Sequence, residues 1–160
     1  MITLVKFEKE MYEQLISWVE SEEDLMLFAG PKFTFPLTTE QLDASLTNEQ
    51  RFAFQVINEG NNLPIGHCEI YLTDEIAVLG RILIGDKSYR GQGFGKAIII
   101  ALLEHIKLNI DRSKIELNVF DFNSNAIKCY EKVGFRINQD KKSEISFKDK
   151  SWTLLNMRIE

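Results

Sequence analysis

The stretch YRGQGFGKAI, residues 89–98, places three glycines at alternate positions directly ahead of a long apolar segment. Such a loop is costly to order, because glycine loses more conformational freedom on folding than any other residue. The residues before the loop are typical of a strand and those after it of a helix, so the loop leads into the free N–H groups of a helix N-terminus. Because no Cβ atoms cover these groups, an anion can approach them, and Arg90 adds a forked donor. The stretch therefore predicts a phosphate-binding loop.

Two well-known phosphate motifs do not match this loop. A P-loop, GxxxxGK[ST], needs a hydroxyl residue after Gly95 and Lys96, where this chain has Ala97. A dinucleotide fingerprint, GxGxxG, needs a glycine at position 96 or 98, where the chain has Lys96 and Ile98. On the loop alone, a plain glycine-rich turn remains an alternative to a phosphate site of another kind.

Hydrophobic periodicity along the rest of the chain predicts a mixed α+β fold. Apolar runs predict strands at residues 2–7, 52–58, 64–73, 76–85 and 114–120, a strand that begins with residues 134–139, and a returning strand at 152–159 after a charged turn around Asp149. The second to fourth strands are expected to form an antiparallel meander. Helical spacing predicts helices at residues 12–19, up to 28, from a Thr39 cap to about Leu46, at 94–110 (buried on most sides) and at 124–133. We expect a single domain over residues 1–160, with a mostly antiparallel central sheet of about seven strands flanked by about four helices.

Charge and cysteine usage narrow the class of protein. The formal net charge of −5 argues against a nucleic-acid partner, which favours a basic face. The two cysteines, Cys68 and Cys129, form no CxxC pair, which fits a reducing compartment. The first ten residues carry four charges, unlike a signal peptide, and no window approaches the roughly 18 apolar residues of a membrane span. We therefore expect a cytoplasmic protein with no membrane or nucleic-acid partner.

Two segments resemble the signatures of a known enzyme family. RGQGFG, residues 90–95, matches R/Q-x-x-G-x-G/A, and NSNAIKCYEKVGF, residues 123–135, matches N-x-x-A-x-x-x-Y-x-x-x-G-F. Both patterns are signatures of the GNAT superfamily of N-acetyltransferases. Either motif alone is only suggestive, but both in this order, separated by a helix and a strand, are a specific signal. The order of elements over most of the chain also resembles this family.

The resemblance implies an acetyl-CoA-dependent N-acetyltransferase that needs no metal. The loop would bind the pyrophosphate of coenzyme A through backbone N–H groups. The preceding strand would hold the pantetheine arm and the acetyl carbonyl through the peptide groups of Ile82, Leu83 and Ile84. The other cofactor-binding residues implied by the resemblance belong to the two signatures: Arg90, Gly91, Gln92, Gly93, Phe94, Gly95, Lys96, Asn123 and Ala126.

Acetyl transfer needs a neutral amine, donors for the oxyanion and a proton for the leaving thiolate. Tyr130 matches the signature tyrosine, and the resemblance implies that it is the general acid, since a phenol is protonated at neutral pH. The alternative is a core tyrosine on a helix stripe. Cys129 lies about 100° from Tyr130 around the helix, so we expect a small buried hydrophobe there rather than a nucleophile. Asn123 is expected both to cap this helix and to contact the cofactor.

A general base is harder to place. In ribosomal-protein acetyltransferases of this family a glutamate stands five residues before the signature asparagine, where this chain has Asn118, which cannot accept a proton. Glu116 shares a strand face with that position, and Glu69 shares another strand face with His67 and Tyr71. Glu69 or Glu116 is therefore the candidate base, with an ordinary polar strand residue as the alternative for each. A site that binds the neutral fraction of its amine needs no base.

The resemblance places the acceptor pocket between the N-terminal helices and the last strands. Phe28, Phe33 and Tyr71 are the candidate substrate-binding residues, and the alternative for the phenylalanines is that they seal the core. An acidic run at residues 20–24 either attracts a polyamine or aminoglycoside or caps a helix. The missing family glutamate favours a small-molecule primary amine (polyamine, aminoglycoside or amino-acid-like) as the acceptor.

Other functions stay open at the level of sequence. A protein N-terminal acetyltransferase and a non-catalytic acyl-CoA-binding module are the main alternatives, although a binding module has less use for a proton donor at Tyr130. A nucleotide-binding domain of another kind is a weaker alternative. Strand edges near the C-terminus allow a homodimer, but nothing in the sequence demands one.

Overall fold

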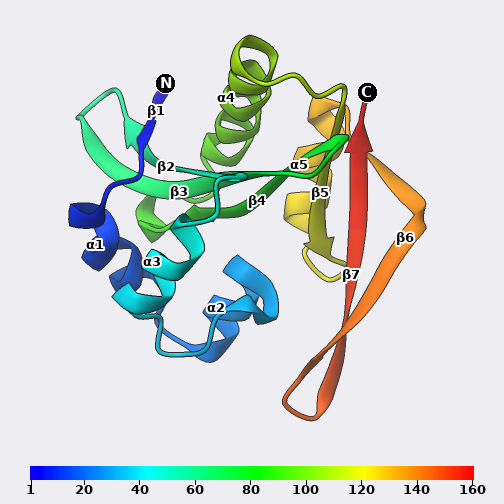
Figure 1. Cartoon of the computed structure of the whole chain (residues 1–160), viewed down its shortest axis with the longest axis horizontal. Helices are drawn as coiled ribbons and strands as arrows, with labels where there is room; N and C mark the ends of the chain where they lie inside the picture. The colour runs from blue at the N-terminus through cyan, green and yellow to red at the C-terminus, as the bar shows by residue number, and fades with distance from the viewer.

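A computed structural model describes all 160 residues, with five α-helices arranged around a seven-stranded sheet (Figure 1). The strands are β1 (Ile2–Lys6), β2 (Arg51–Asn58), β3 (Leu63–Leu72), β4 (Ile76–Ile84), β5 (Lys114–Phe120), β6 (Arg136–Phe147) and β7 (Lys150–Ile159). The helices are α1 (Tyr12–Trp18), α2 (Glu22–Ala29), α3 (Thr39–Leu46), α4 (Phe94–Asn109) and α5 (Ser124–Val133), with 3₁₀ turns η1 (Lys9–Met11), η2 (Gly30–Lys32) and η3 (Lys87–Tyr89). The strand number is as predicted. Each of the five helical segments predicted from the spacing forms an α-helix, one more than the approximate total of four.

The sheet opens between two of its central strands. Its order is β1-β2-β3-β4-β5-β7-β6, and every neighbouring pair is antiparallel except β4 and β5, so the predicted meander of β2, β3 and β4 is confirmed. The parallel pairing of β4 with β5 begins at Ile76 and Lys114 and ends at Leu79 and Leu117. Residues 80–84 of β4 therefore have no partner on the β5 side.

A bulge in β4 lies at the point where this opening begins. β4 places two residues, Arg81 and Ile82, opposite Cys68 of β3. Arg81 has a backbone φ of 48°, in the left-handed region that residues other than glycine rarely adopt. Because a bulge bends its strand and re-aims a side chain, it sets both the course of β4 and the position of the Arg81 guanidinium.

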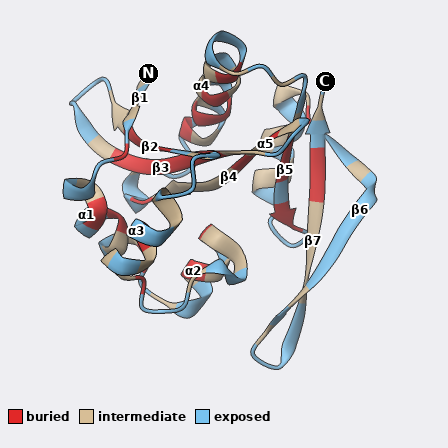
Figure 2. Ribbon diagram, viewed as in Figure 1, coloured by how far each residue is buried: buried red, intermediate tan, exposed pale blue.

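Helices cover both faces of the sheet. One hydrophobic cluster joins α4 and α5 to one face, and a second joins α1, α2 and α3 to the other (Figures 1 and 2). The prediction that α4 is buried on most sides is wrong: five apolar side chains at helical spacing are buried, but Ile100 is 40% and Leu108 81% exposed. A helix on one face of a sheet needs only one apolar stripe. No helix is long and apolar enough to cross a membrane.

The short N-terminal helices are defined by their caps. The Ser21 hydroxyl accepts a hydrogen bond from the backbone N–H of Asp24 at 3.0 Å, so α2 starts at the predicted break. The predicted cap of α3 is wrong by one residue. Thr38, not Thr39, accepts the hydrogen bond from the backbone N–H of Gln41, at 3.3 Å.

Candidate active site

Helix α4 begins directly after the glycine-rich loop. Gly93 is the N-cap residue of α4 and has no side chain to accept a capping hydrogen bond. Ala97 donates its backbone N–H to the Gly93 carbonyl at 3.2 Å. The N–H groups of the first turn, those of Phe94, Gly95 and Lys96, therefore have no partner within the helix. The loop ends at a set of free donors on the positive end of a 16-residue helix.

The backbone of this loop requires glycine at two positions and leaves open space in front of it. Gly91 and Gly93 have φ values of 76° and 87°. A Cβ atom at either residue would meet no atom within 4 Å. Free N–H groups facing open space fit an anion such as a pyrophosphate. The Arg90 Nε atom donates to the Ile84 carbonyl at 2.9 Å, which ties the loop to the end of β4.

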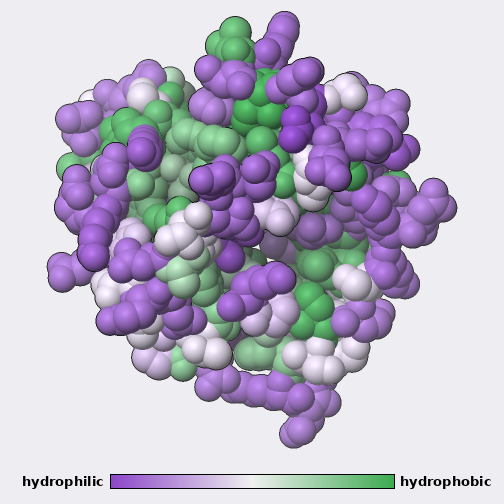
Figure 3. Space-filling view, viewed as in Figure 1, coloured by the Kyte–Doolittle hydropathy of each residue, from purple (hydrophilic) through white to green (hydrophobic).

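A cavity of about 310 Å³ lies where β4 and β5 separate. Its walls come from the end of α2 and from η2, from β4 and β5, from α5 and from the β6–β7 hairpin, and the space-filling view is hollowed near its centre (Figure 3). Five of the predicted site residues line it: Phe28, Tyr71, Ile82, Asn123 and Tyr130. The loop of residues 90–96 and the other predicted residues lie outside its walls. The cavity thus joins the predicted acid to the acceptor side of the sheet.

Tyr130 reaches the cavity from α5. Its hydroxyl makes no hydrogen bond with the protein, while its ring lies 6.4 Å from the ring of the core residue Phe135. Burial raises the pKa of Tyr130 to about 12, with a smaller contribution from Cys129. The phenol is therefore protonated at neutral pH, which suits a proton donor and not a base. The packing of the ring against the core agrees with the core interpretation, and the free hydroxyl on the cavity wall agrees with the catalytic one, so the two do not exclude each other.

The residues around Tyr130 support its placement. The Asn123 Oδ1 atom accepts the backbone N–H of Ala126 at 3.4 Å, which confirms the predicted cap of α5, and Asn123 also lines the cavity. Cys129 does not line the cavity. Its Sγ atom would lie 3.9 Å from a Cβ atom at Gly95, so it packs between α5 and α4. Tyr130 and Cys129 thus face different surroundings, as expected from their helical angle.

Glu69 lies in a buried charged cluster and not on the cavity wall. Its Oε1 atom accepts from Nη1 of Arg51 at 2.9 Å and from Nη1 of Arg81 at 3.2 Å, and its Oε2 atom lies 2.7 Å from Nε2 of His67. Burial acts to raise the pKa of Glu69, but His67 and the two arginines outweigh it and hold that pKa below its usual range. These contacts keep the carboxylate charged and disfavour it as a proton acceptor.

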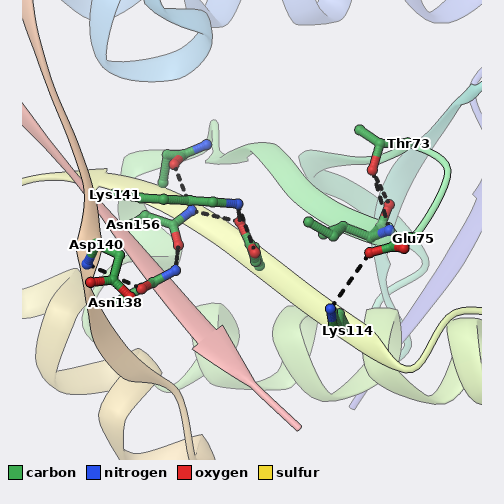
Figure 4. A network of polar contacts seen from close by, with 10 residues as sticks. Thr73, Glu75, Lys114, Asn138, Asp140, Lys141 and Asn156 are labelled. Carbon is green, nitrogen blue, oxygen red and sulfur yellow. Dashed lines mark hydrogen bonds and ion pairs between the residues drawn. The ribbon is translucent and has the colours of Figure 1, made fainter.

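Glu116, the other candidate base, is also held by a cation. Its two oxygen atoms accept from Nζ of Lys141 at 2.8 and 3.0 Å. The Asn156 side chain bridges the network, donating to Glu116 at 3.0 Å and to Asn118 at 3.1 Å; Figure 4 shows Lys141 and Asn156 meeting over β5. Glu116 is 4% exposed and does not line the cavity, whereas Asn118 does. The cavity therefore has an amide where the family glutamate would stand.

Two arginines on the acceptor side were not predicted as site residues. Arg51 and Arg81 line the cavity, with Arg51 stacked 4.9 Å from the Tyr71 ring centroid and Arg81 4.3 Å from that of Phe33. Phe28 and Tyr71 are on the wall, while Phe33 lies beneath Arg81 instead. For Arg81 the available sequence signal was a single cation within an otherwise apolar strand, whereas Arg51 lies just before the predicted strand of residues 52–58. No group of three or more His, Cys, Asp or Glu side chains is placed to hold a metal.

Relatives of known sequence match parts of this chain. The prophage-derived, uncharacterised N-acetyltransferase YokL of Bacillus subtilis (strain 168) is 31% identical over 88 residues, 54% of this chain and 49% of that protein. The spermine/spermidine N(1)-acetyltransferase of the same strain is 36% identical over 53 residues, 33% of this chain and 35% of that protein. The matched segment thus spans about half or less of the length of these curated relatives.

A structural comparison and a family match cover more of this chain than the partial sequence matches do. The crystal structure of spermidine N-acetyltransferase from Vibrio cholerae in complex with CoA and spermine has a TM-score of 0.82, covering 99% of this chain and 94% of that one at 20% identity, so the fold is shared. The model of the acetyltransferase (GNAT) family matches residues 9–135, a range that contains both signatures and both strands of the opening. This chain belongs to the acetyltransferase (GNAT) family.

Proposed function

We propose that this chain, acting as one domain over residues 1–160, transfers the acetyl group of acetyl-CoA to a primary amine of a small molecule. The observation that carries the proposal is the cavity at the open end of the β4–β5 pair, which has Tyr130 on one wall and the acceptor-side residues on another. The free N–H groups at the start of α4 add a fitting site for the pyrophosphate.

In the proposed reaction, the chain binds acetyl-CoA largely through its backbone. The loop donors hold the pyrophosphate, and the pantetheine arm enters the gap beside residues 82–84. The amine nitrogen attacks the acetyl carbonyl carbon, the carbon–sulfur bond breaks, and the sulfur takes the Tyr130 proton while the amine loses one. Peptide N–H groups that β5 leaves unpaired on β4 supply donors for the developing oxyanion.

The proposal includes no dedicated general base. Glu69 and Glu116 are both held by cations and lie outside the cavity walls. The enzyme is instead proposed to bind the neutral fraction of its amine, and the released proton passes to solvent. A cytoplasmic location belongs to the proposal, because both cysteines are free. A homodimer remains a prediction.

Asn118 favours one competing function from another class. With an amide in place of the family glutamate, the chain would serve as an acyl-CoA-binding module that performs no transfer. Transfer to a protein N-terminus is the other alternative. The relatives named as polyamine acetyltransferases support a small-molecule acceptor over both.

The test is thiol release from acetyl-CoA across a panel of polyamines, aminoglycosides, amino acids and peptides with free N-termini. Turnover with a small-molecule class, strongly reduced in Tyr130→Phe, supports the proposal. Turnover with peptides alone points to the N-terminal acetyltransferase. Tight acetyl-CoA binding in calorimetry without any thiol release would instead favour the binding module.

A further inference from the structure

The cavity wall has a one-sided charge pattern. Three cationic side chains line it, those of Lys32, Arg51 and Arg81, and no aspartate or glutamate does. Glu69, directly behind the wall, pairs with both arginines and so offsets only one of them. The acceptor side of the cavity is therefore net positive.

The two guanidinium groups retain donors for a ligand. Arg51 and Arg81 both reach Glu69 through Nη1, and Nη1 of Arg81 also donates to the Ser45 hydroxyl at 2.6 Å. The Nη2 and Nε atoms of both arginines make no hydrogen bond with the protein. Nδ1 of His67 is the one side-chain nitrogen or oxygen that is buried without a partner, so these unpaired arginine donors are not fully buried. Side chains only 17% and 8% exposed, with free forked donors, form a built site for a carboxylate.

The carboxylates that a polyamine would need lie outside the cavity. In the acidic run at residues 20–24, the Asp24 Oδ2 atom accepts the backbone N–H of Glu20 at 3.1 Å, and Glu22 and Glu23 stand in the first turn of α2. Glu20 lies 3.7 Å from Lys87, and Glu116 is held by Lys141. None of these acidic side chains lines the cavity. A polycation would therefore meet like charge without a compensating partner.

Much of the remaining wall is apolar, although Asn118, Asn123 and the hydroxyls of Tyr71 and Tyr130 also belong to the lining residues. Its apolar side chains come from α2, β5 and the β6–β7 hairpin and are those of Leu27, Phe28, Phe120, Ile145 and Leu154. The volume of about 310 Å³ is at the low end for a small-molecule pocket, and the acetyl end of the cofactor must share it. This space and these walls suit a compact acceptor with an apolar side chain.

We propose that the acceptor is an amine that carries a carboxylate and an apolar group, as in an apolar amino acid, and not a polyamine. The inference rests on the proposed function and specifies its substrate class. Arg51 and Arg81 hold the carboxylate, with Lys32 at the cavity rim. The same positive wall disfavours the ammonium form of the bound acceptor and so favours the neutral nucleophile, in a site where no carboxylate is free to take its proton.

The experiment compares matched acceptors at one pH. Thiol release is measured with apolar amino acids, with their amides and with spermidine. The amide of an amino acid keeps the side chain but has a neutral group in place of the carboxylate. At a given pH a larger fraction of its amine is neutral than in the acid, because no negative charge stabilises the ammonium. A preference for the acid over its amide therefore cannot come from the neutral fraction.

The expected result is a kcat/KM for the acid at least about tenfold above that of its amide and of spermidine. Arg51→Gln should remove most of this preference, and Lys32→Gln, at an exposed residue that does not affect folding, part of it. Lys9→Gln, which removes a cation outside the cavity, should leave the preference unchanged. Unchanged acetyl-CoA affinity in each variant shows that the fold is kept.

Two results overturn the inference in distinguishable ways. Faster turnover of spermidine or of the amides, insensitive to Arg51→Gln and Lys32→Gln, contradicts the carboxylate site and leaves the proposed acetyl transfer intact. No thiol release with any amine, while acetyl-CoA binds, contradicts the proposed function and the inference with it.

Discussion

The two sides of the cavity are built from different parts of the chain. On the proposed cofactor side the candidate binding groups are backbone: the loop around Gly91 and Gly93, the first turn of α4 and the unpaired edge of β4. On the proposed acceptor side they are side chains, chiefly Arg51 and Arg81 with Glu69 behind them. A backbone site tolerates sequence change wherever its glycines persist, whereas a side-chain site changes its ligand with a single substitution. We therefore expect the proposed cofactor side to be common to the family and the proposed acceptor side to determine the substrate of this chain.

The largest effect is expected from a carboxylate placed in the loop. Gly93→Asp puts a Cβ and a negative charge where the pyrophosphate is proposed to bind, at a φ of 87°. Acetyl-CoA affinity should fall by about a hundredfold or more, as calorimetry can measure. Gly60→Asp, in the β2–β3 turn, is the matched control and should bind normally. Wild-type affinity in Gly93→Asp would show that the loop is not the pyrophosphate site.

Removing the phenol should affect turnover and not binding. Tyr130→Phe keeps the ring in the core, so the acetyl-CoA Kd should stay nearly unchanged while kcat falls by about a hundredfold. Tyr12→Phe is the control, since the Tyr12 hydroxyl donates to Asp43 at 2.8 Å and neither residue lines the cavity. This variant should lose stability but keep its transfer rate. Equal kcat in Tyr130→Phe and wild type removes Tyr130 from the mechanism.

The charged cluster behind the acceptor wall should matter for stability. Glu69→Gln leaves Arg81, 8% exposed, without its carboxylate and should cost about 3 kcal/mol in the free energy of unfolding. Because the pKa of Glu69 is lowered, its contribution is complete above the usual carboxyl pKa and is lost as pH falls through the folded-state pKa. The difference between wild type and variant should therefore shrink in acid.

Urea denaturation at several pH values checks this prediction. Glu75→Gln, which removes an exposed pair with Lys114, should show no measurable change. If Glu69→Gln unfolds at the wild-type urea concentration but loses most of its kcat, Glu69 is a base after all.

The smallest effect is expected at the acidic run. Glu22→Gln and Glu23→Gln change side chains in the first turn of α2 that do not line the cavity. Both should lower thermal stability slightly, because they face the positive helix end, and should leave kcat/KM for any acceptor within about twofold. A selective loss with polyamines would show that the run attracts a cationic acceptor.

The same contrast explains how much of the molecule the sequence could predict. Apolar alternation and the α5 signature are local patterns, so the seven strands and the Asn123 cap could be predicted from the sequence, and Tyr130 lies on the cavity wall. Arg51 and Arg81 meet Glu69 from positions 18 and 12 residues away, through strand pairing and a bulge. No local sequence pattern predicts these ion pairs. Strand alternation placed Glu69 on one face with His67 and Tyr71 but could not show that two arginines pair with its carboxylate.

The burial of α4 was misjudged for a related reason. Its apolar composition predicted cover on most sides, but the sheet offers one face, and Leu108 lies 81% exposed at the end of the helix. The apolar composition of a helix indicates how much surface it could bury. How much it does bury depends on how many neighbouring elements pack against it.

The most direct test of the account is the pH dependence of the Tyr130 contribution. The kcat of the wild type and of Tyr130→Phe are measured between pH 7 and pH 10, and their ratio is compared across that range. A pKa of about 12 keeps the phenol protonated throughout, so the account predicts a constant ratio of about a hundredfold. A ratio near one at every pH, or a ratio that collapses well below pH 10, would contradict the claim that this cavity delivers the Tyr130 proton to the leaving thiolate.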